Sequence, residues 1–235
     1  MKLLVSVVDK AEALEAAKGG AHIVDVKNPE EGALGANFPW IIRQVRKSIL
    51  SQVEVSATLG DLPYLPGTAS LAALGAAASG ANYVKAGLYG VKTVEEAVKL
   101  LTGVRKALEG LKPKVQTIAA GYADYETWGC LSPWKLPLAA YKAEVDGLMV
   151  DVKRKNLQNL FDHVHLGELK LFVQEAHTYG LKVALAGGLT AENLEALRDT
   201  SVDIVGVRRS VLSAAGRVDR EKVSRMLEAT SFPER

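Results

Sequence analysis

The sequence has one cysteine, Cys130, and no long apolar run. A single thiol excludes an internal disulfide and a zinc site built from several cysteines. No segment approaches the roughly 18 apolar residues of a membrane-spanning helix. The apolar start of the chain is interrupted at Asp9 and Lys10, which is too early for a signal peptide. We therefore expect a cytoplasmic protein without a membrane partner.

The sequence also lacks an excess of charge of one sign, because it contains 29 basic and 27 acidic residues. The run Lys153–Lys155 is short, and no ladder of aromatic residues accompanies the lysines, so no nucleic-acid partner is predicted. The histidines lack the spacing of metal ligands; they are His22, His163, His165 and His177. We expect neither a metal nor a cofactor.

What the sequence does contain is a regular alternation of short apolar runs and longer helical patterns. The predicted strands are Leu3–Val8, His22–Lys27, Val53–Thr58, Tyr83–Gly87, Val115–Gly121, Leu148–Val152, Val183–Gly187 and Ile204–Val207. Helices are predicted at Ala11–Lys18, Trp40–Ile49, Ser70–Ser79, Val94–Leu108, Leu166–Tyr179 and Glu192–Leu197. Eight such units predict an α/β protein with one (β/α)8 TIM-barrel domain over residues 1–235. An open doubly wound sheet is the alternative, although no GxGxxG follows the first strand.

Charged residues interrupt the apolar strands in an ordered way. Side chains two residues apart share a face of a strand, so Asp25 and Lys27 are predicted to face the barrel axis. The same alternation directs Lys85 and Asp151 inward, with Lys155 following nearby. All of these residues lie at or after the carboxyl ends of strands, which carry the chemistry in this fold.

The inward lysines and aspartates suit carbonyl chemistry. A lysine held among other cations in a partly dry site more readily provides the neutral amine that forms a Schiff base. Neighbouring carboxylates can move the protons that imine formation and enolisation require. The alternative is an ion-pair layer that only fills the barrel, which gains little net stability.

Glycines follow the last two predicted strands. Gly187 and Gly188 precede a helix, and Gly206 and Arg208 lie at the eighth strand. Loops at these positions often bind phosphate through backbone N–H groups, although glycines can also serve only to form tight turns. Together with the inward lysines, they predict a phosphorylated carbonyl substrate.

The segment GYADYETWGCLSPWKLP after the fifth strand is rich in aromatic residues. It is consistent with a lid, a subunit contact or core packing, and we expect a homo-oligomer. Cys130 lies within it without a predicted partner base, so a nucleophilic role is not favoured.

Several stretches carry a specific resemblance. DVKNPEEGALGANFPW, SATLGDLPYLPGTASLAALGAAASGANYVKAGLYG, AAGYAD and DIVGVR resemble the (5-formylfuran-3-yl)methyl phosphate synthase family of methanofuran biosynthesis, from the first strand to the eighth. The resemblance implies a class I aldolase-like barrel. It also implies a lyase that condenses two molecules of glyceraldehyde 3-phosphate into 4-(hydroxymethyl)-2-furancarboxaldehyde phosphate.

The same resemblance implies residue roles. Lys27 in DVKNP would form the Schiff base, and Lys85 in YVKAGLYG would accept a proton. Asp25, Asp151 and Lys155 would assist proton transfer.

The chain departs from the family pattern at two places. Asn156–Gln158 stands where the family tends to have Asp-Gly-Lys, and Arg209, followed by Ser210, stands where it tends to have glycine. These departures concern the loops and not Lys27 or Lys85.

Two other functions are compatible with the pattern. Asp25, Lys27 and Glu30 resemble the Asp-x-Lys-x-x-Asp arrangement of barrel decarboxylases, or of related isomerases, which would use no imine. A non-catalytic phosphate-binding barrel would keep the glycine loops but would not require two inward lysines.

Overall fold

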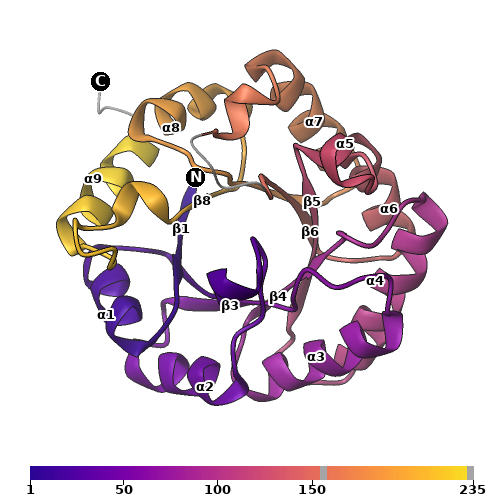
Figure 1. Cartoon of the computed structure of the whole chain (residues 1–235), viewed down its shortest axis with the longest axis horizontal. Coiled ribbons are helices and arrows are strands. Elements are labelled where there is room, and N and C mark those ends of the chain that lie inside the picture. Colours follow the sequence, from indigo (N-terminus) through magenta and orange to yellow (C-terminus); the bar gives the residue numbers. More distant parts are fainter. Residues whose placement is uncertain (154–157, 232–235) are drawn as a thin grey trace.

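The computed structural model describes residues 1–153 and 158–231. Its strands form a closed barrel in which each strand pairs in parallel with the next, and β8 closes onto β1. The helices form an outer ring (Figure 1), so the predicted TIM barrel is confirmed. The strands are β1 Lys2–Val7, β2 Ile23–Val26, β3 Glu54–Thr58, β4 Tyr83–Gly87, β5 Gln116–Tyr122, β6 Gly147–Asp151, β7 Lys182–Leu185 and β8 Ile204–Val207. The α-helices are α1 Lys10–Lys18, α2 Pro39–Ser48, α3 Pro66–Ala78, α4 Val94–Leu108, α5 Tyr125–Trp128, α6 Leu136–Lys142, α7 Leu166–Thr178, α8 Ala191–Leu197 and α9 Arg220–Thr230. Short 3₁₀ turns are η1 Pro29–Glu31, η2 Pro133–Lys135, η3 Leu160–Asp162, η4 Arg198–Thr200 and η5 Arg209–Val211.

Alternation along the strands divides the buried apolar residues into two groups. Val24 and Val84 point outward and belong to the layer between the sheet and the helices. Ile23, Tyr83 and Met149 belong to a separate cluster inside the barrel. Because successive side chains point to opposite faces, apolar side chains are buried on both faces of the sheet. Each fully buried apolar side chain contributes about 1.5–3 kcal/mol to the stability of the fold.

Helix starts follow from local capping. Asp9 accepts the backbone N–H of Glu12 at 3.0 Å at the start of α1, and Thr93 and Glu96 form a capping box before α4. Such caps satisfy N–H groups that have no partner within the helix. In the described part of the chain, no helix combines the length and apolar character needed to span a membrane.

Some element boundaries differ from the sequence-based prediction. β2 ends at Val26 and β7 ends at Leu185, so Lys27 and Gly187 lie just beyond their strands. Three helices, α5, α6 and α9, were not predicted. The first two are short, and α9 is mostly polar, with its apolar residues confined to one face. A short or weakly apolar pattern gives little periodic signal.

The loop after β2 folds back over the barrel mouth, where Figure 1 shows it turning in toward the middle. The hydroxyl of Thr58 donates to the Gly35 carbonyl at 2.6 Å, and the backbone N–H of Gly60 donates to the Leu34 carbonyl at 3.1 Å. Leu34 is fully buried and packs in the inner cluster. This loop, residues 28–35, therefore closes one side of the barrel over the β3 end.

Candidate active site

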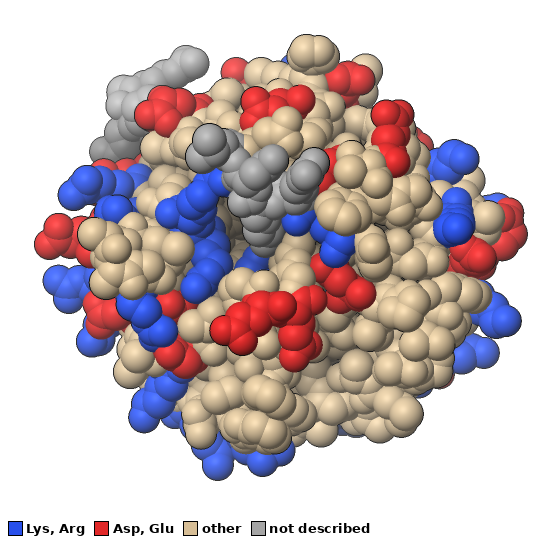
Figure 2. Space-filling model, in the orientation of Figure 1, with Lys and Arg blue, Asp and Glu red and all other residues tan. Residues whose placement is uncertain are grey.

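A cavity of about 200 Å³ opens at the carboxyl ends of the strands. Figure 2 shows lysine and arginine atoms on the wall of a hollow at the middle of this face. The cavity brings together most of the site residues predicted from the sequence. Its lining comprises Leu4, Ser6, Lys27, Pro29, Lys85, Met149, Asp151, Val152, Gln158, Ala186, Gly187, Gly188, Gly206, Val207, Arg208, Arg209 and Leu212.

A buried ion pair lies beneath this cavity. The Lys85 ammonium is 2.7 Å from Asp25 Oδ2, and the Ser6 hydroxyl donates to the same oxygen at 3.0 Å. Burial alone would raise the pKa of Asp25, but the positive charges of Lys85 and Lys27 outweigh burial and hold that pKa below its ordinary value of 3.8. Asp25 is therefore a carboxylate at neutral pH, although its side chain is fully buried.

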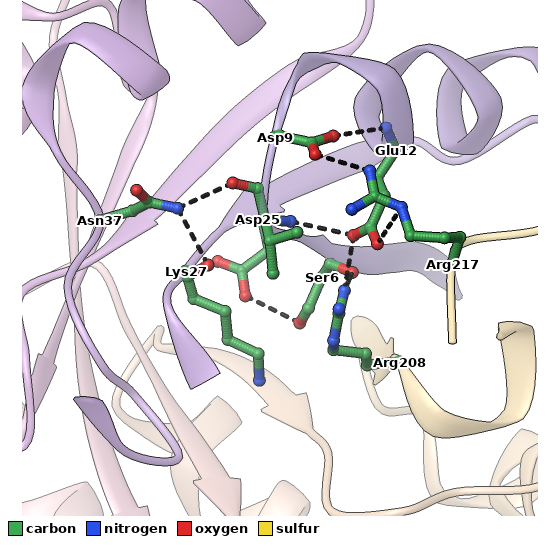
Figure 3. A network of polar contacts seen from close by, with 9 residues as sticks. Ser6, Asp9, Glu12, Asp25, Lys27, Asn37, Arg208 and Arg217 are labelled. Carbon is green, nitrogen blue, oxygen red and sulfur yellow. Dashed lines mark hydrogen bonds and ion pairs between the residues drawn. The ribbon is translucent and has the colours of Figure 1, made fainter. Parts of the chain in front are cut away.

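Lys27 reaches the cavity from the first position after β2. Its ammonium donates to the backbone carbonyl of Ala33 at 3.2 Å, and the residue is 4% exposed. Asn37 fixes the backbone by donating to the carbonyls of Lys27 and Val8 at 3.1 and 2.9 Å (Figure 3). The amine is thus held at the cavity wall by a folded-back loop, and its backbone is anchored from the side.

Asp151 ends β6 and also lines the cavity. It is 4% exposed, and its Oδ1 accepts the backbone N–H of Val152 at 2.8 Å. Lys155, the remaining predicted catalytic residue, lies outside the described residues, as do Asn156 and Leu157.

The predicted phosphate loops border the cavity on the side of β7 and β8. Gly187 and Gly188 have φ angles of +107° and +68°, in the left-handed region that favours glycine. A Cβ on Gly188 would lie 2.5 Å from Arg209 Nη2, so a side chain there would displace that guanidinium. Gly187, Gly188 and Gly206 all belong to the cavity lining.

Two arginines follow β8 with different surroundings. Arg208 Nη1 donates to Glu12 Oε2 at 2.8 Å and to the Ser6 carbonyl at 2.9 Å (Figure 3). Arg209 Nη2 donates to the Gln158 carbonyl at 3.3 Å, close to Gly188. Both arginines line the cavity, so this wall carries two positive charges.

A buried glutamate organises the Arg208 side. Glu12 on α1 is 2% exposed and accepts the backbone N–H of Val8 at 3.0 Å as well as Arg208. Arg217 contacts Glu12 Oε1 at 3.3 Å and Asp9 Oδ2 at 2.6 Å. The network connects the start of α1 with the segment after β8.

A second polar cluster lies beside the loop after β2. Asp61 accepts the Lys153 ammonium at 2.9 Å and the Tyr122 hydroxyl. Lys153 also lies 4.1 Å from the centre of the Tyr89 ring and 5.3 Å from that of Trp128. Ionic and cation–π contacts together fix this lysine.

The sequence missed Ser6, Glu12, Asp61, Tyr122 and Lys153 as site residues. Ser6 had a usable signal, since it is the polar residue in an otherwise apolar first strand after Lys2. Asp61 lies on a loop, where spacing does not indicate which way a side chain faces. Glu12 lies on a helix, where a charged residue is normally expected to be exposed. Within the described residues, no group of histidine, cysteine or acidic side chains is arranged to hold a metal ion.

Known proteins resemble this chain in both sequence and fold. Among solved structures, KGPDC from Streptococcus mutans has a TM-score of 0.67 at 14% identity, covering 97% of this chain and 96% of its own. Phosphoribosyl anthranilate isomerase from Thermus thermophilus has a TM-score of 0.63 at 17% identity, covering 97% of this chain and 98% of its own. At these identities the likeness concerns the fold alone.

Sequence relatives are much closer. The (5-formylfuran-3-yl)methyl phosphate synthase of Archaeoglobus fulgidus is 49% identical over 97% of this chain and 99% of its own length. The synthase of the same name from Methanocaldococcus jannaschii is 48% identical over 97% and 99%. The family model of 4-HFC-P synthase matches residues 3–227. The chain therefore belongs to the 4-HFC-P synthase family of enzymes.

Proposed function

We propose that this protein condenses two molecules of glyceraldehyde 3-phosphate into 4-(hydroxymethyl)-2-furancarboxaldehyde phosphate for methanofuran biosynthesis. The observation that carries the proposal is one cavity that presents Lys27 and Lys85 opposite the glycine loops after β7 and β8. Amine groups on one wall and backbone N–H groups with arginines on the other suit a phosphorylated aldehyde.

Lys27 acts as the nucleophile in this proposal. Its neutral amine adds to the aldehyde carbon of one triose, and the carbinolamine loses water to give an imine. The imine withdraws electrons from the neighbouring carbon, so a proton can be removed there and the resulting enamine can attack the second triose. Hydrolysis later frees Lys27.

Lys85 and Asp25 handle protons. An ammonium must lose its proton before it can accept another, and the Asp25 carboxylate lies within 2.7 Å to receive it. Asp151 lines the same cavity and serves the proton transfers of ring closure and water loss, together with Lys155. These roles divide the acid–base work between the buried Asp25–Lys85 pair and the residues Asp151 and Lys155.

The atoms balance when two trioses give one furan phosphate, one inorganic phosphate and two waters. The enzyme is therefore a phosphate-eliminating lyase that needs no oxidant. Gly187, Gly188, Gly206 and Arg208 bind substrate phosphate in this proposal, which is supported by the positive φ angles of Gly187 and Gly188 and by the presence of all four residues in the cavity lining.

A decarboxylase or isomerase of the Asp-x-Lys-x-x-Asp type is less well supported. Such a site requires its last carboxylate beside the lysine, but Glu30 is exposed and is not among the residues lining the cavity. A non-catalytic barrel is disfavoured by membership in a family of synthases.

The proposed substrate also indicates where in the cell the enzyme acts. Phosphorylated trioses are charged and do not cross a lipid bilayer unaided, which supports a cytoplasmic location. We further propose that the protein is a homo-oligomer.

Borohydride trapping tests the proposal. The protein is incubated with glyceraldehyde 3-phosphate, reduced and digested, and the peptide that contains Lys27 is examined for a covalent mass addition. Lys27→Ala should abolish the adduct and turnover, whereas the exposed Lys47→Ala should retain both. Phosphate release should equal half of the triose consumed. An unmodified Lys27 peptide during turnover would refute the Schiff-base mechanism.

A further inference from the structure

Asp61 connects two loops at the barrel mouth. It follows β3, and its carboxylate is only 4% exposed. One oxygen, Oδ2, lies 2.9 Å from the Lys153 ammonium, and the other accepts the Tyr122 hydroxyl. The burial of Tyr122 and the negative charges of Asp61 and Asp151 raise its pKa, so the phenol keeps its proton and remains a donor.

The same carboxylate contacts the loop that holds Lys27. The backbone N–H of Leu34 donates to Asp61 Oδ2 at 3.5 Å, and the carbonyl of the same peptide group, that of Ala33, accepts the Lys27 ammonium at 3.2 Å. One peptide group therefore bridges Asp61 and Lys27. Hydrogen bonds in such a chain polarise one another, so an anion on the N–H side strengthens the carbonyl as an acceptor.

The packing of this loop on Asp61 is close. Gly32 has a φ of +132°, and a Cβ there would lie 2.2 Å from Asp61 Oδ2. Glycine thus permits the carboxylate to lie directly against the loop backbone. The same oxygen, Oδ2, also contacts the Lys153 ammonium, which is itself held over the Tyr89 ring.

We propose that Asp61 is a positioning residue for Lys27. It holds the Ala33–Leu34 peptide in the orientation that directs the Lys27 amine into the cavity, and Lys153 and Tyr122 fix Asp61 in turn. This inference rests on the proposed Schiff-base function of Lys27. Asp61 itself does not line the cavity and needs no contact with substrate.

The test compares wild type with Asp61→Asn and with Asp61→Asn/Lys153→Met. The single variant leaves a largely buried lysine without its anion and is expected to lose stability. The double variant removes that unpaired charge, which separates stability from positioning. Measurements are the melting temperature, kcat and KM for glyceraldehyde 3-phosphate, and the rate of borohydride trapping on Lys27.

In the double variant, we expect kcat and the trapping rate to fall by about tenfold or more while KM changes by less than about threefold. The reason is that the phosphate loops lie on the other wall and are unaltered. Asp146→Asn is the matched control, since it removes a carboxylate paired with Lys114 before β6 and should leave both rates unchanged.

Gly32→Ala is an additional variant that tests the same role if the double variant does not fold. The added Cβ would displace the Asp61 carboxylate without removing a charge, so kcat and the rate of borohydride trapping should both fall. If the folded double variant or Gly32→Ala has the kcat and the trapping rate of the wild type, the proposed role of Asp61 is wrong. The Schiff-base function of Lys27 is not affected by that result. Wild-type protein that turns over without an adduct on Lys27 overturns the Schiff-base function and this inference with it.

Discussion

The ammonium of Lys85 and the carboxylate of Asp25 lie 2.7 Å apart, and their side chains are 3% and 0% exposed. The pair joins β2 to β4 across β3 in the barrel interior. Both charges are withdrawn from water, so each relies on the other to offset its loss of hydration. Removing one partner therefore lowers the stability of the fold by more than the intact pair contributes to it.

Asp25→Asn should therefore destabilise the protein by about 3–5 kcal/mol at neutral pH, because it leaves the Lys85 charge buried and unpaired. Urea unfolding measures the difference. Asp25→Asn/Lys85→Met should recover much of the loss, and a single variant as stable as wild type would show that the pair carries little energy.

The pH dependence of that difference follows from the depressed pKa of Asp25. A carboxyl group with a lowered folded-state pKa contributes stability that is fully present above its unfolded value, here 3.8, and is lost as pH falls through the folded value. The stability gap between wild type and Asp25→Asn should thus be constant near neutrality and shrink in acid below that value. A gap that widened on acidification would contradict the assignment.

Gly188→Ala should raise the KM for glyceraldehyde 3-phosphate. The new Cβ would displace Arg209 Nη2 and narrow the approach to the backbone donors. Gly180→Ala is the matched control, because Gly180 has a similar φ of +71° but open space around it. Both variants should lose about 1–2 kcal/mol of stability from left-handed strain. Equal KM values in the two variants would show that Gly188 is not part of the proposed phosphate site.

Glu12→Gln should weaken phosphate binding by loosening Arg208. The guanidinium loses a charged partner at 2.8 Å and is expected to sample more orientations. We expect the KM for glyceraldehyde 3-phosphate to rise by about three- to tenfold with little change in kcat. The inhibition constant of inorganic phosphate is measured on the same variant. Arg217→Gln perturbs the outer part of the same network and should have the smaller effect. A fall in kcat alone would assign Glu12 a different role.

Cys130 should react slowly with thiol reagents in the native state. Burial raises the pKa of its thiol to about 11, and the residue is 8% exposed. Only about a thousandth of the thiol is ionised at pH 8, and the thiolate is the reactive form. Iodoacetamide labelling followed by mass spectrometry should show one modification per chain after unfolding and almost none before. Rapid native labelling would indicate that α5 opens.

The barrel and the inward charges were predictable because they rest on strict periodicity. Each of Asp25 and Lys85 lies inside an apolar strand, so alternation alone assigns its face. The supporting residues were not predictable in this way. Asp61 reaches Lys153 across 92 positions of sequence, and Glu12 reaches Arg208 across 196. Such pairs depend on how the barrel closes and on the path of each loop, and neither is encoded in local spacing.

The burial of Asp25 has a consequence for how the site exchanges protons with its surroundings. Two side chains that hydrogen-bond with this carboxylate, Ser6 and Lys85, line the cavity, whereas Asp25 itself does not. The Asp25 carboxylate is thus separated from the cavity, and in the proposed function it exchanges protons with a bound substrate only through the Ser6 hydroxyl and the Lys85 amine. Because the Asp25 side chain is 0% exposed, no buffer molecule can contact it, and proton exchange at this carboxylate should not depend on buffer concentration.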